Sequence, residues 1–149
     1  MMTRKSFLKS AVATVAGITT APLASMVGGC APAAFSVRAP VVDNRVIIPL
    51  DGLPDLKQPY AYAKVYTERH ANPFVIFRLD DGQIRAVLTT CSHSGCEVRK
   101  LPTKFECPCH GSEYSLMGSV LKGPAPAPLE SFVVEQYADR LEFLLEGPE

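Results

Sequence analysis

Two short stretches of the chain combine cysteine and histidine at spacings typical of metal ligands. Residues 91–96 read Cys-Ser-His-Ser-Gly-Cys, and residues 107–112 read Cys-Pro-Cys-His-Gly-Ser. Each stretch offers one thiolate and one imidazole and leaves one further cysteine, Cys96 in the first and Cys109 in the second. The four candidate metal ligands are Cys91, His93, Cys107 and His110.

Two kinds of metal centre use such a mixed ligand set. Zinc accepts cysteine and histidine in tetrahedral structural sites, usually grouped as Cys-x-x-Cys and His-x-x-x-His. A 2Fe-2S cluster with two histidines on one iron has a much higher reduction potential than one held by four cysteines. Here each stretch alternates the two ligand types and leaves a cysteine over, which zinc does not explain. The spacing favours the iron-sulfur cluster, and zinc is the alternative.

The two stretches resemble the paired signature of the Rieske iron-sulfur proteins, Cys-x-His-x-Gly-Cys and Cys-x-Cys-His-x-Ser. This resemblance covers the chain from about residue 44 onward. It implies that one iron is bound by two cysteines, Cys91 and Cys107. It implies that the other iron is bound by two histidines, His93 and His110.

The same resemblance implies roles for four further residues. Cys96 and Cys109 would form a disulfide between the two loops. Ser112 would bond a bridging sulfide, and Tyr114 would bond a ligand sulfur. Hydrogen bonds to sulfur stabilise the reduced state, so both residues would raise the reduction potential. The alternatives are an ordinary loop hydroxyl for Ser112 and a core aromatic for Tyr114.

A proline-rich segment follows the second stretch. Residues 123–129 read Gly-Pro-Ala-Pro-Ala-Pro-Leu. Each proline fixes its backbone and removes a donor, which predicts a stiff extended loop. It resembles the loop that covers the cluster in Rieske proteins of cytochrome bc and b6f complexes, and the alternative is a rigid connector. The residues expected to cover the site are Gly123, Pro124, Ala125 and Pro126.

One position departs from the family pattern. Quinol-facing relatives usually carry leucine between the first histidine and the glycine, whereas this chain has Ser94. A hydroxyl there admits water and weakens the packing of a quinone. His70 lies outside both stretches and is expected to be a loop residue, because four ligands are already supplied.

The N-terminus has the pattern of an export signal. Residues 1–9 carry three basic and no acidic residues, and residues 10–37 carry no charge. The start is similar to the twin-arginine motif, with lysine in place of the second arginine. Residues 27–30, Val-Gly-Gly-Cys, resemble a lipobox, so Cys30 is a possible lipidation site. An uncleaved membrane anchor and plain cleavage are the alternatives.

Charge and cysteine usage indicate where the protein works. The chain has 15 basic and 15 acidic residues; without the three basic residues of the signal, 12 and 15 remain. No basic patch suggests nucleic acid. A disulfide would suit an oxidising compartment, which favours the periplasm or the outer face of a bacterial cytoplasmic membrane. No nucleophile, paired base or phosphate loop indicates a stand-alone catalytic site, and whether the chain belongs to an enzyme stays open.

The elements that must position these residues read as β-strands. We expect an export signal or anchor over 1–29, a linker over 30–43 and one domain over 44–149, with a cluster-binding subdomain at about 90–121. Short runs rich in β-branched and aromatic residues predict strands at 46–50, 61–67, 74–79, 84–89, 132–137 and 141–145. An Asp-Asp-Gly turn at 80–82 joins two of them. These runs predict an all-β antiparallel sandwich or open barrel of about nine or ten short strands.

The family resemblance also implies a function. The bc and b6f Rieske subunits accept electrons from quinol beside a cytochrome b-type subunit and pass them to a c-type cytochrome. A membrane-tethered electron carrier of that kind is the expected role. The alternative is the small iron-sulfur subunit of a periplasmic oxidoreductase such as an arsenite oxidase.

Overall fold

The computed structural model describes residues 35–145, so the expected signal or anchor over 1–29 and Cys30 lie outside the described residues. This part of the chain contains twelve short strands and no helix. No helix with the length and apolar character needed to cross a membrane occurs among these residues. The strands are β1 (Phe35–Arg38), β2 (Val41–Val42), β3 (Arg45–Pro49), β4 (Tyr62–Tyr66), β5 (Phe74–Arg78), β6 (Ile84–Leu88), β7 (Arg99–Lys100), β8 (Lys104–Glu106), β9 (Glu113–Ser115), β10 (Val120–Lys122), β11 (Ser131–Gln136) and β12 (Arg140–Leu144).

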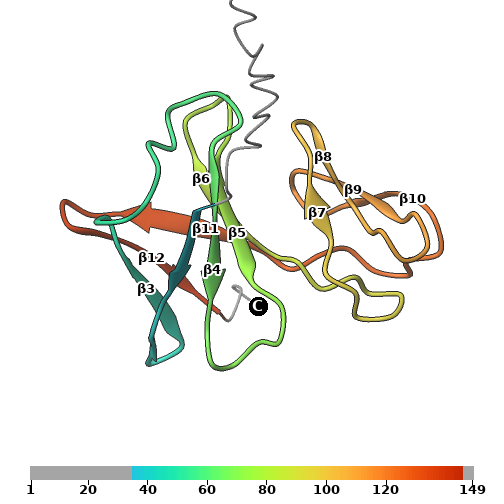
Figure 1. Cartoon of the computed structure of the whole chain (residues 1–149), viewed down its shortest axis with the longest axis horizontal. Coiled ribbons are helices and arrows are strands. Elements are labelled where there is room, and N and C mark those ends of the chain that lie inside the picture. Colours follow the sequence, from blue (N-terminus) through green and yellow to red (C-terminus); the bar gives the residue numbers. More distant parts are fainter. Residues whose placement is uncertain (1–34, 146–149) are drawn as a thin grey trace, which may run out of the picture. The chain divides into compact units, whose positions relative to one another are not determined.

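The strands form two sheets. The larger sheet has eight strands in the order β1-β4-β5-β6-β11-β12-β3-β2, and the smaller has four in the order β10-β9-β8-β7. All pairings are antiparallel except the parallel pair β1 and β4. The all-β prediction is confirmed, and the six strands expected from sequence match β3, β4, β5, β6, β11 and β12 to within one residue at each end. Figure 1 shows β7, β8, β9 and β10 grouped beside the larger sheet.

The linker expected over 30–43 is not borne out for its described part. Residues 35–38 form β1 and residues 41–42 form β2, and β1 adds to the edge of the larger sheet beside β4. Phe35–Arg38 pair in register with residues 63–66, and the amide of Ala39 donates to the carbonyl of Tyr66. The proline and alanine content that suggested a linker did not reveal the backbone groups that the edge of β4 leaves for a further strand.

Strand β5 contributes side chains to two hydrophobic cores, one on each of its faces. Side chains of a strand point alternately to opposite faces of its sheet. Phe74 and Ile76 therefore lie in the core of the larger sheet, while Val75 and Phe77 face the second core, which contains the smaller sheet's Phe105. All four of these β5 residues are buried, which explains why β5 reads as a continuous apolar run.

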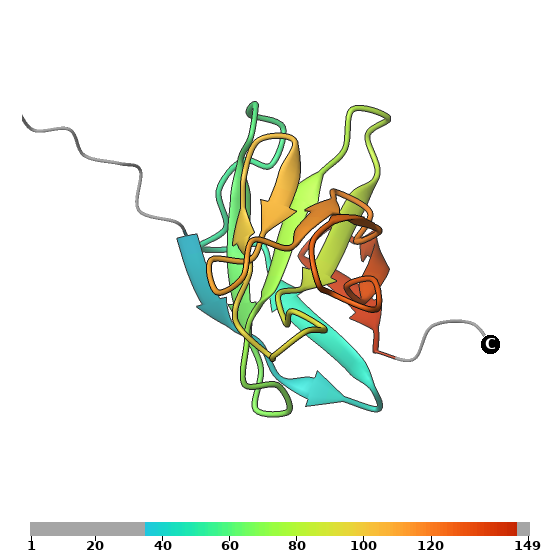
Figure 2. The same ribbon diagram turned by 90° about the vertical axis from the view of Figure 1, so that its right-hand side faces the viewer.

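The smaller sheet is attached to the larger one through this second core. The rings of Phe77 on β5 and Phe105 on β8 pack edge to face with centroids 5.9 Å apart. Figure 2 shows the smaller sheet in front of β5 and β6. The core also contains Cys91, Cys107 and Tyr114, so the same packing that joins the two sheets buries candidate site residues.

Candidate metal centre

The two cysteine and histidine stretches are loops with the same backbone geometry. In the first loop, the amide of Gly95 donates to the carbonyl of Cys91 over 2.8 Å, and the amide of Cys91 donates to the carbonyl of Cys96 over 2.9 Å. The second loop repeats these two hydrogen bonds, at 3.0 and 2.8 Å. Gly95 and Gly111 both have positive φ, 73° and 71°, a conformation that glycine adopts without steric cost. The glycines of both signatures are therefore required by these turns.

The four candidate ligands form an inner and an outer pair. Cys91 and Cys107 are free thiols, 2% and 1% exposed. His93 and His110 are exposed, their Nδ1 atoms are 3.2 Å apart, and their ring centroids are 4.7 Å apart. Each loop thus places its first cysteine in the core and its histidine at the surface, and the loops face each other.

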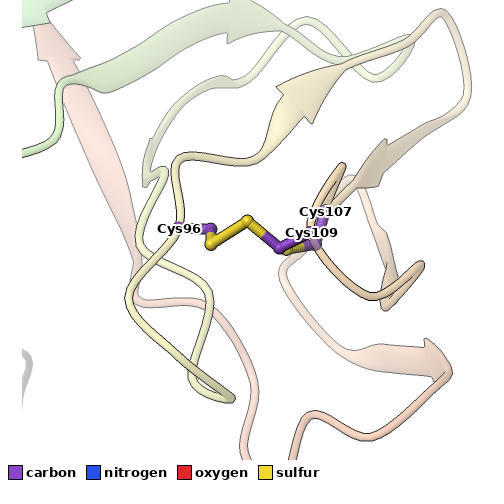
Figure 3. A group of neighbouring side chains, drawn as sticks. All are labelled: Cys96, Cys107 and Cys109. Carbon is purple, nitrogen blue, oxygen red and sulfur yellow. A yellow bond between two sulfur atoms is a disulfide. The ribbon is translucent and has the colours of Figure 1, made fainter.

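The two remaining cysteines form the expected disulfide. Cys96 and Cys109 are bonded at an S–S distance of 2.03 Å, which joins the first loop to the second. Figure 3 shows Cys107 beside this bond, and the three sulfurs lie within 4.8 Å of one another. Since two of the three sulfurs are bonded to each other, only Cys107 of this group keeps a thiol that can bind metal.

Hydrogen bonds favour the thiolate form of Cys91. The hydroxyl of Tyr114 lies 3.2 Å from the Sγ of Cys91. Burial raises the pKa of Cys91, but hydrogen bonds from Tyr114, from the amides of His93 and Ser94 and from Cys107 outweigh it, so the pKa lies below its ordinary value. Burial and the contact with Cys91 raise the pKa of Tyr114, which keeps that hydroxyl protonated. Because the thiolate is the form that binds metal, this environment suits a ligand.

Ser112 carries a buried hydroxyl whose Oγ has no partner among the described residues. A buried donor left unpaired is costly, and native proteins rarely retain one without a reason. A cofactor that presents acceptor atoms at the second loop, as the sulfides of an iron-sulfur cluster do, would satisfy it. Gly123 fits against this residue, because a Cβ at position 123 would come within 2.6 Å of the Cα of Ser112.

The proline-rich segment lies against the first loop. The hydroxyl of Ser92 donates to the carbonyl of Ala127 over 2.6 Å and accepts from the amide of Ala127 over 3.2 Å. Ala125 and Leu129 are buried in the same core as the two free thiols, whereas Pro124 and Pro126 are exposed. The segment is therefore held by the buried side chains of Ala125 and Leu129 and by the hydrogen bonds between Ala127 and Ser92.

Sequence reasoning missed two residues that hold these loops. Ser92 occupies a variable position of the first signature, so nothing marked it as a partner of residue 127. Asn72, in the loop between β4 and β5, donates to the first loop and has no sequence signal at all. The neighbouring His70 is a loop residue, as expected; it contacts Thr67 and packs edge to face on Phe74.

Comparisons with known proteins agree with this site. Residues 53–133 match the sequence profile of the Rieske [2Fe-2S] domain. The cytochrome b6-f complex iron-sulfur subunit of Chlorobaculum thiosulfatiphilum is 40% identical over 63 residues, 41% of this chain and 32% of that protein. The corresponding subunit of Chlorobaculum tepidum is 27% identical over 135 residues, 89% of this chain and 70% of that protein.

A solved structure shares the fold. A chain from the complex of oxygenase and ferredoxin in carbazole 1,9a-dioxygenase superimposes with a TM-score of 0.54 at 22% identity, covering 72% of this chain and 99% of that one. The plasma membrane Rieske protein PetC3 from Synechocystis PCC 6803 is 35% identical, with a TM-score of 0.49, over 55% of this chain and 84% of that one.

The fold and the paired loops define an iron-sulfur protein. The chain belongs to the Rieske [2Fe-2S] domain family. Its cofactor is therefore a 2Fe-2S cluster and not zinc. The first relative matches this chain over about a third of its own length, 32%.

Proposed function

We propose that this chain is the iron-sulfur subunit of a membrane respiratory complex, in which it accepts electrons from quinol beside a cytochrome b-type subunit and passes them to a c-type cytochrome. The observation that carries the proposal is the pair of exposed imidazoles, His93 and His110, above two buried thiols. The proline-rich segment beside this pair resembles the loop that covers the cluster in the bc and b6f proteins, and the disulfide joins the two ligand loops as the Rieske resemblance implies.

The inner and outer pairs support the ligand assignment that the family resemblance implies. The thiolates of Cys91 and Cys107 would bind one iron, and the imidazoles of His93 and His110 would bind the other. Bound in this way, a 2Fe-2S cluster supplies a one-electron carrier of raised reduction potential. The two loops hold the ligands with matching turns, and the disulfide keeps the turns together.

Other side chains would adjust the site without binding the metal. The hydroxyl of Tyr114 lies 3.2 Å from the sulfur of Cys91 and would donate to it in the thiolate form, and the unpaired Ser112 hydroxyl is available to a sulfide. Both donors favour the more negative, reduced state and so raise the potential. The segment over Gly123, Pro124, Ala125 and Pro126 would exclude water from one side of the site.

Electrons would enter and leave at the exposed histidine pair. A docked partner can contact these rings directly, because neither is covered by any other described segment. Ser94 stands beside His93, with its Oγ 3.3 Å from the Nδ1 of that ring. Quinol-facing relatives usually carry leucine at this position, so the polar Ser94 favours a second candidate function. In that function the chain is the small iron-sulfur subunit of a periplasmic oxidoreductase such as an arsenite oxidase.

The N-terminal part of the chain would hold the domain at the membrane. We propose that residues 1–29 act as an export signal or anchor and that Cys30 is a site of lipidation. Either arrangement would place the Rieske domain on the periplasmic or outer face of a bacterial cytoplasmic membrane. A mass measurement of the protein from the membrane fraction distinguishes a lipidated N-terminus from a retained or cleaved one.

The proposal is tested on the full chain in its native membrane. The reduction potential is measured by titration monitored by electron paramagnetic resonance, and partners are identified after mild solubilisation. A potential in the upper part of the range from about −150 to +300 mV, with a co-purifying cytochrome b, is expected. A molybdenum-containing partner would favour the alternative. A low potential and no cytochrome would contradict the quinol-linked role.

A further inference from the structure

Asn72 lies outside both ligand loops, but its side chain hydrogen-bonds to both ends of the first loop. It belongs to the loop between β4 and β5, immediately before the buried Pro73. Its Nδ2 donates to the carbonyl of Gly95 over 2.9 Å and to the Oγ1 of Thr90 over 3.1 Å. Thr90 immediately precedes the first loop and Gly95 lies near its end, so a single amide group ties together the two sides of the loop.

Other contacts also hold the two ends of the first loop, among them the hydrogen bond from the amide of Val98 to the carbonyl of Thr89. Thr90 and Glu97 form an isolated β-bridge, and Glu97 is held by the ammonium of Lys64 on β4 at 2.6 Å. Lys64 in the middle of β4 and Asn72 in the β4–β5 loop thus bind Glu97 and Gly95, the two chain neighbours of the disulfide cysteine of this loop. Because β5 is buried on both faces, the β4–β5 hairpin is a rigid support for the loop.

We propose that Asn72 is a positioning residue that sets the reduction potential by fixing the conformation of the first ligand loop. This inference rests on the proposed role of Cys91 and His93 as ligands. The side-chain hydrogen bonds of Asn72 go to neither of these residues. It acts through Gly95, whose carbonyl it binds and whose amide closes the turn on the carbonyl of Cys91.

The link to the potential runs through this turn. The amides of His93 and Ser94 belong to peptides between Cys91 and Gly95, so they lie within the turn that the amide of Gly95 closes on the carbonyl of Cys91. A shift of the Gly95 peptide tilts these peptides and with them the N–H groups that can donate to the sulfur of Cys91. Donors directed at a ligand sulfur stabilise the reduced state, so a loosened turn lowers the potential.

Two substitutions and one control test the inference. Asn72→Ala removes both hydrogen bonds, and Asn72→Asp keeps the size of the side chain but turns a donor toward the Gly95 carbonyl into an acceptor. Thr67→Ala is the matched control, because it removes the side-chain contact with His70 in the same β4–β5 loop without touching the ligand loops. Each variant is made in the full chain.

Two measurements are made on each variant. The first is the midpoint potential of the protein carrying its cluster, and the second is amide hydrogen exchange in peptides covering residues 90–97, with residues 104–115 as the internal reference. We expect both Asn72 variants to lower the midpoint, Asp more than Ala, and to speed exchange severalfold in 90–97 alone. Thr67→Ala should leave both readouts at their wild-type values.

An unchanged midpoint and unchanged exchange in 90–97 would overturn the inference, even if the melting temperature fell, because Asn72 would then be only structural. Faster exchange with an unchanged midpoint would overturn the link to the potential. If the full chain carried no cluster, the proposed function would fail, while the exchange measurement would still decide whether Asn72 holds the loop.

Discussion

The hydroxyl of Tyr114 lies 3.2 Å from the Sγ of Cys91, and the two residues are 0% and 2% exposed. Tyr114 stands on β9, directly after the second loop, whereas Cys91 begins the first loop after β6. The contact therefore joins the two loops inside the core, as the disulfide joins them nearer the surface. Because water does not reach it, this hydrogen bond acts in a low-dielectric environment that strengthens it.

Removing this hydroxyl should lower the reduction potential. A hydrogen bond that favours the reduced state by about 1 kcal/mol corresponds to about 40 mV for a one-electron couple. We expect Tyr114→Phe to shift the midpoint downward by roughly this amount, since the ring and its packing are kept. Tyr62→Phe is the control, because Tyr62 packs against the same core from β4. Equal midpoints for wild type and Tyr114→Phe would show that the contact does not favour reduction.

Ser112→Ala should act differently in the two states of the protein. Without a cluster, the substitution removes a buried hydroxyl that lacks a partner, so the free energy of unfolding should stay the same or rise. With the cluster bound, the midpoint should fall, because a donor to sulfide is lost. Ser131→Ala is the matched control, since Ser131 on β11 also carries a buried, unpartnered Oγ but lies outside the ligand loops. A clear loss of stability in the cluster-free Ser112→Ala protein would contradict this assignment.

Ser92→Ala should release the proline-rich segment from the first loop. The substitution deletes the two hydrogen bonds with Ala127 and leaves the buried Ala125 and Leu129 in place. We expect faster amide exchange in peptides covering 124–128 and faster loss of iron in air, while the fold is retained. Ser92→Thr, which keeps the hydroxyl, should retain most of the protection. Equal rates of iron loss for wild type and Ser92→Ala would show that attachment of the proline-rich segment does not protect the site.

The ion pair between Lys104 and Glu113 should make the smaller sheet sensitive to acid. The carboxylate of Glu113 lies 2.8 Å from the Nζ of Lys104, and this hydrogen bond lowers the pKa of Glu113 below its ordinary value of 4.5. Since the pKa is lower in the folded state, the pair stabilises the fold above the ordinary pKa and loses this effect as pH falls through the folded value.

The measurement for this pair is the pH dependence of unfolding below pH 4.5. Glu113→Gln removes the titrating group, so the variant should lose stability less steeply than wild type across this acid range. Above the ordinary pKa the two proteins should differ by a constant amount. Parallel curves over the whole range would indicate that the pair does not titrate with folding.

Much of the fold and of the candidate site could be predicted from local patterns. Runs rich in β-branched and aromatic residues located the longer strands, and cysteine and histidine spacing located the two loops. The short strands β1 and β2 were missed, because a partner strand and not their own composition orders them. Asn72 and Ser92 were missed for a related reason: each acts through a contact to a backbone carbonyl that is 23 or 35 residues away in the chain, and such contacts leave no periodic signal.

The disulfide should contribute to stability and to retention of the cluster in separable ways. Cys96 and Cys109 are separated by 13 residues, and closing a loop of this size stabilises a fold by about 3 kcal/mol through the unfolded state. The double substitution Cys96→Ala with Cys109→Ala avoids leaving a free thiol beside Cys107. We expect a lower free energy of unfolding by about 2 to 4 kcal/mol in the cluster-free protein, measured in urea. The loaded protein should also lose iron faster, because the two ligand loops then separate more easily. If iron loss were unchanged while stability fell, the Tyr114 contact and the packing of the second core would be sufficient to keep the loops together.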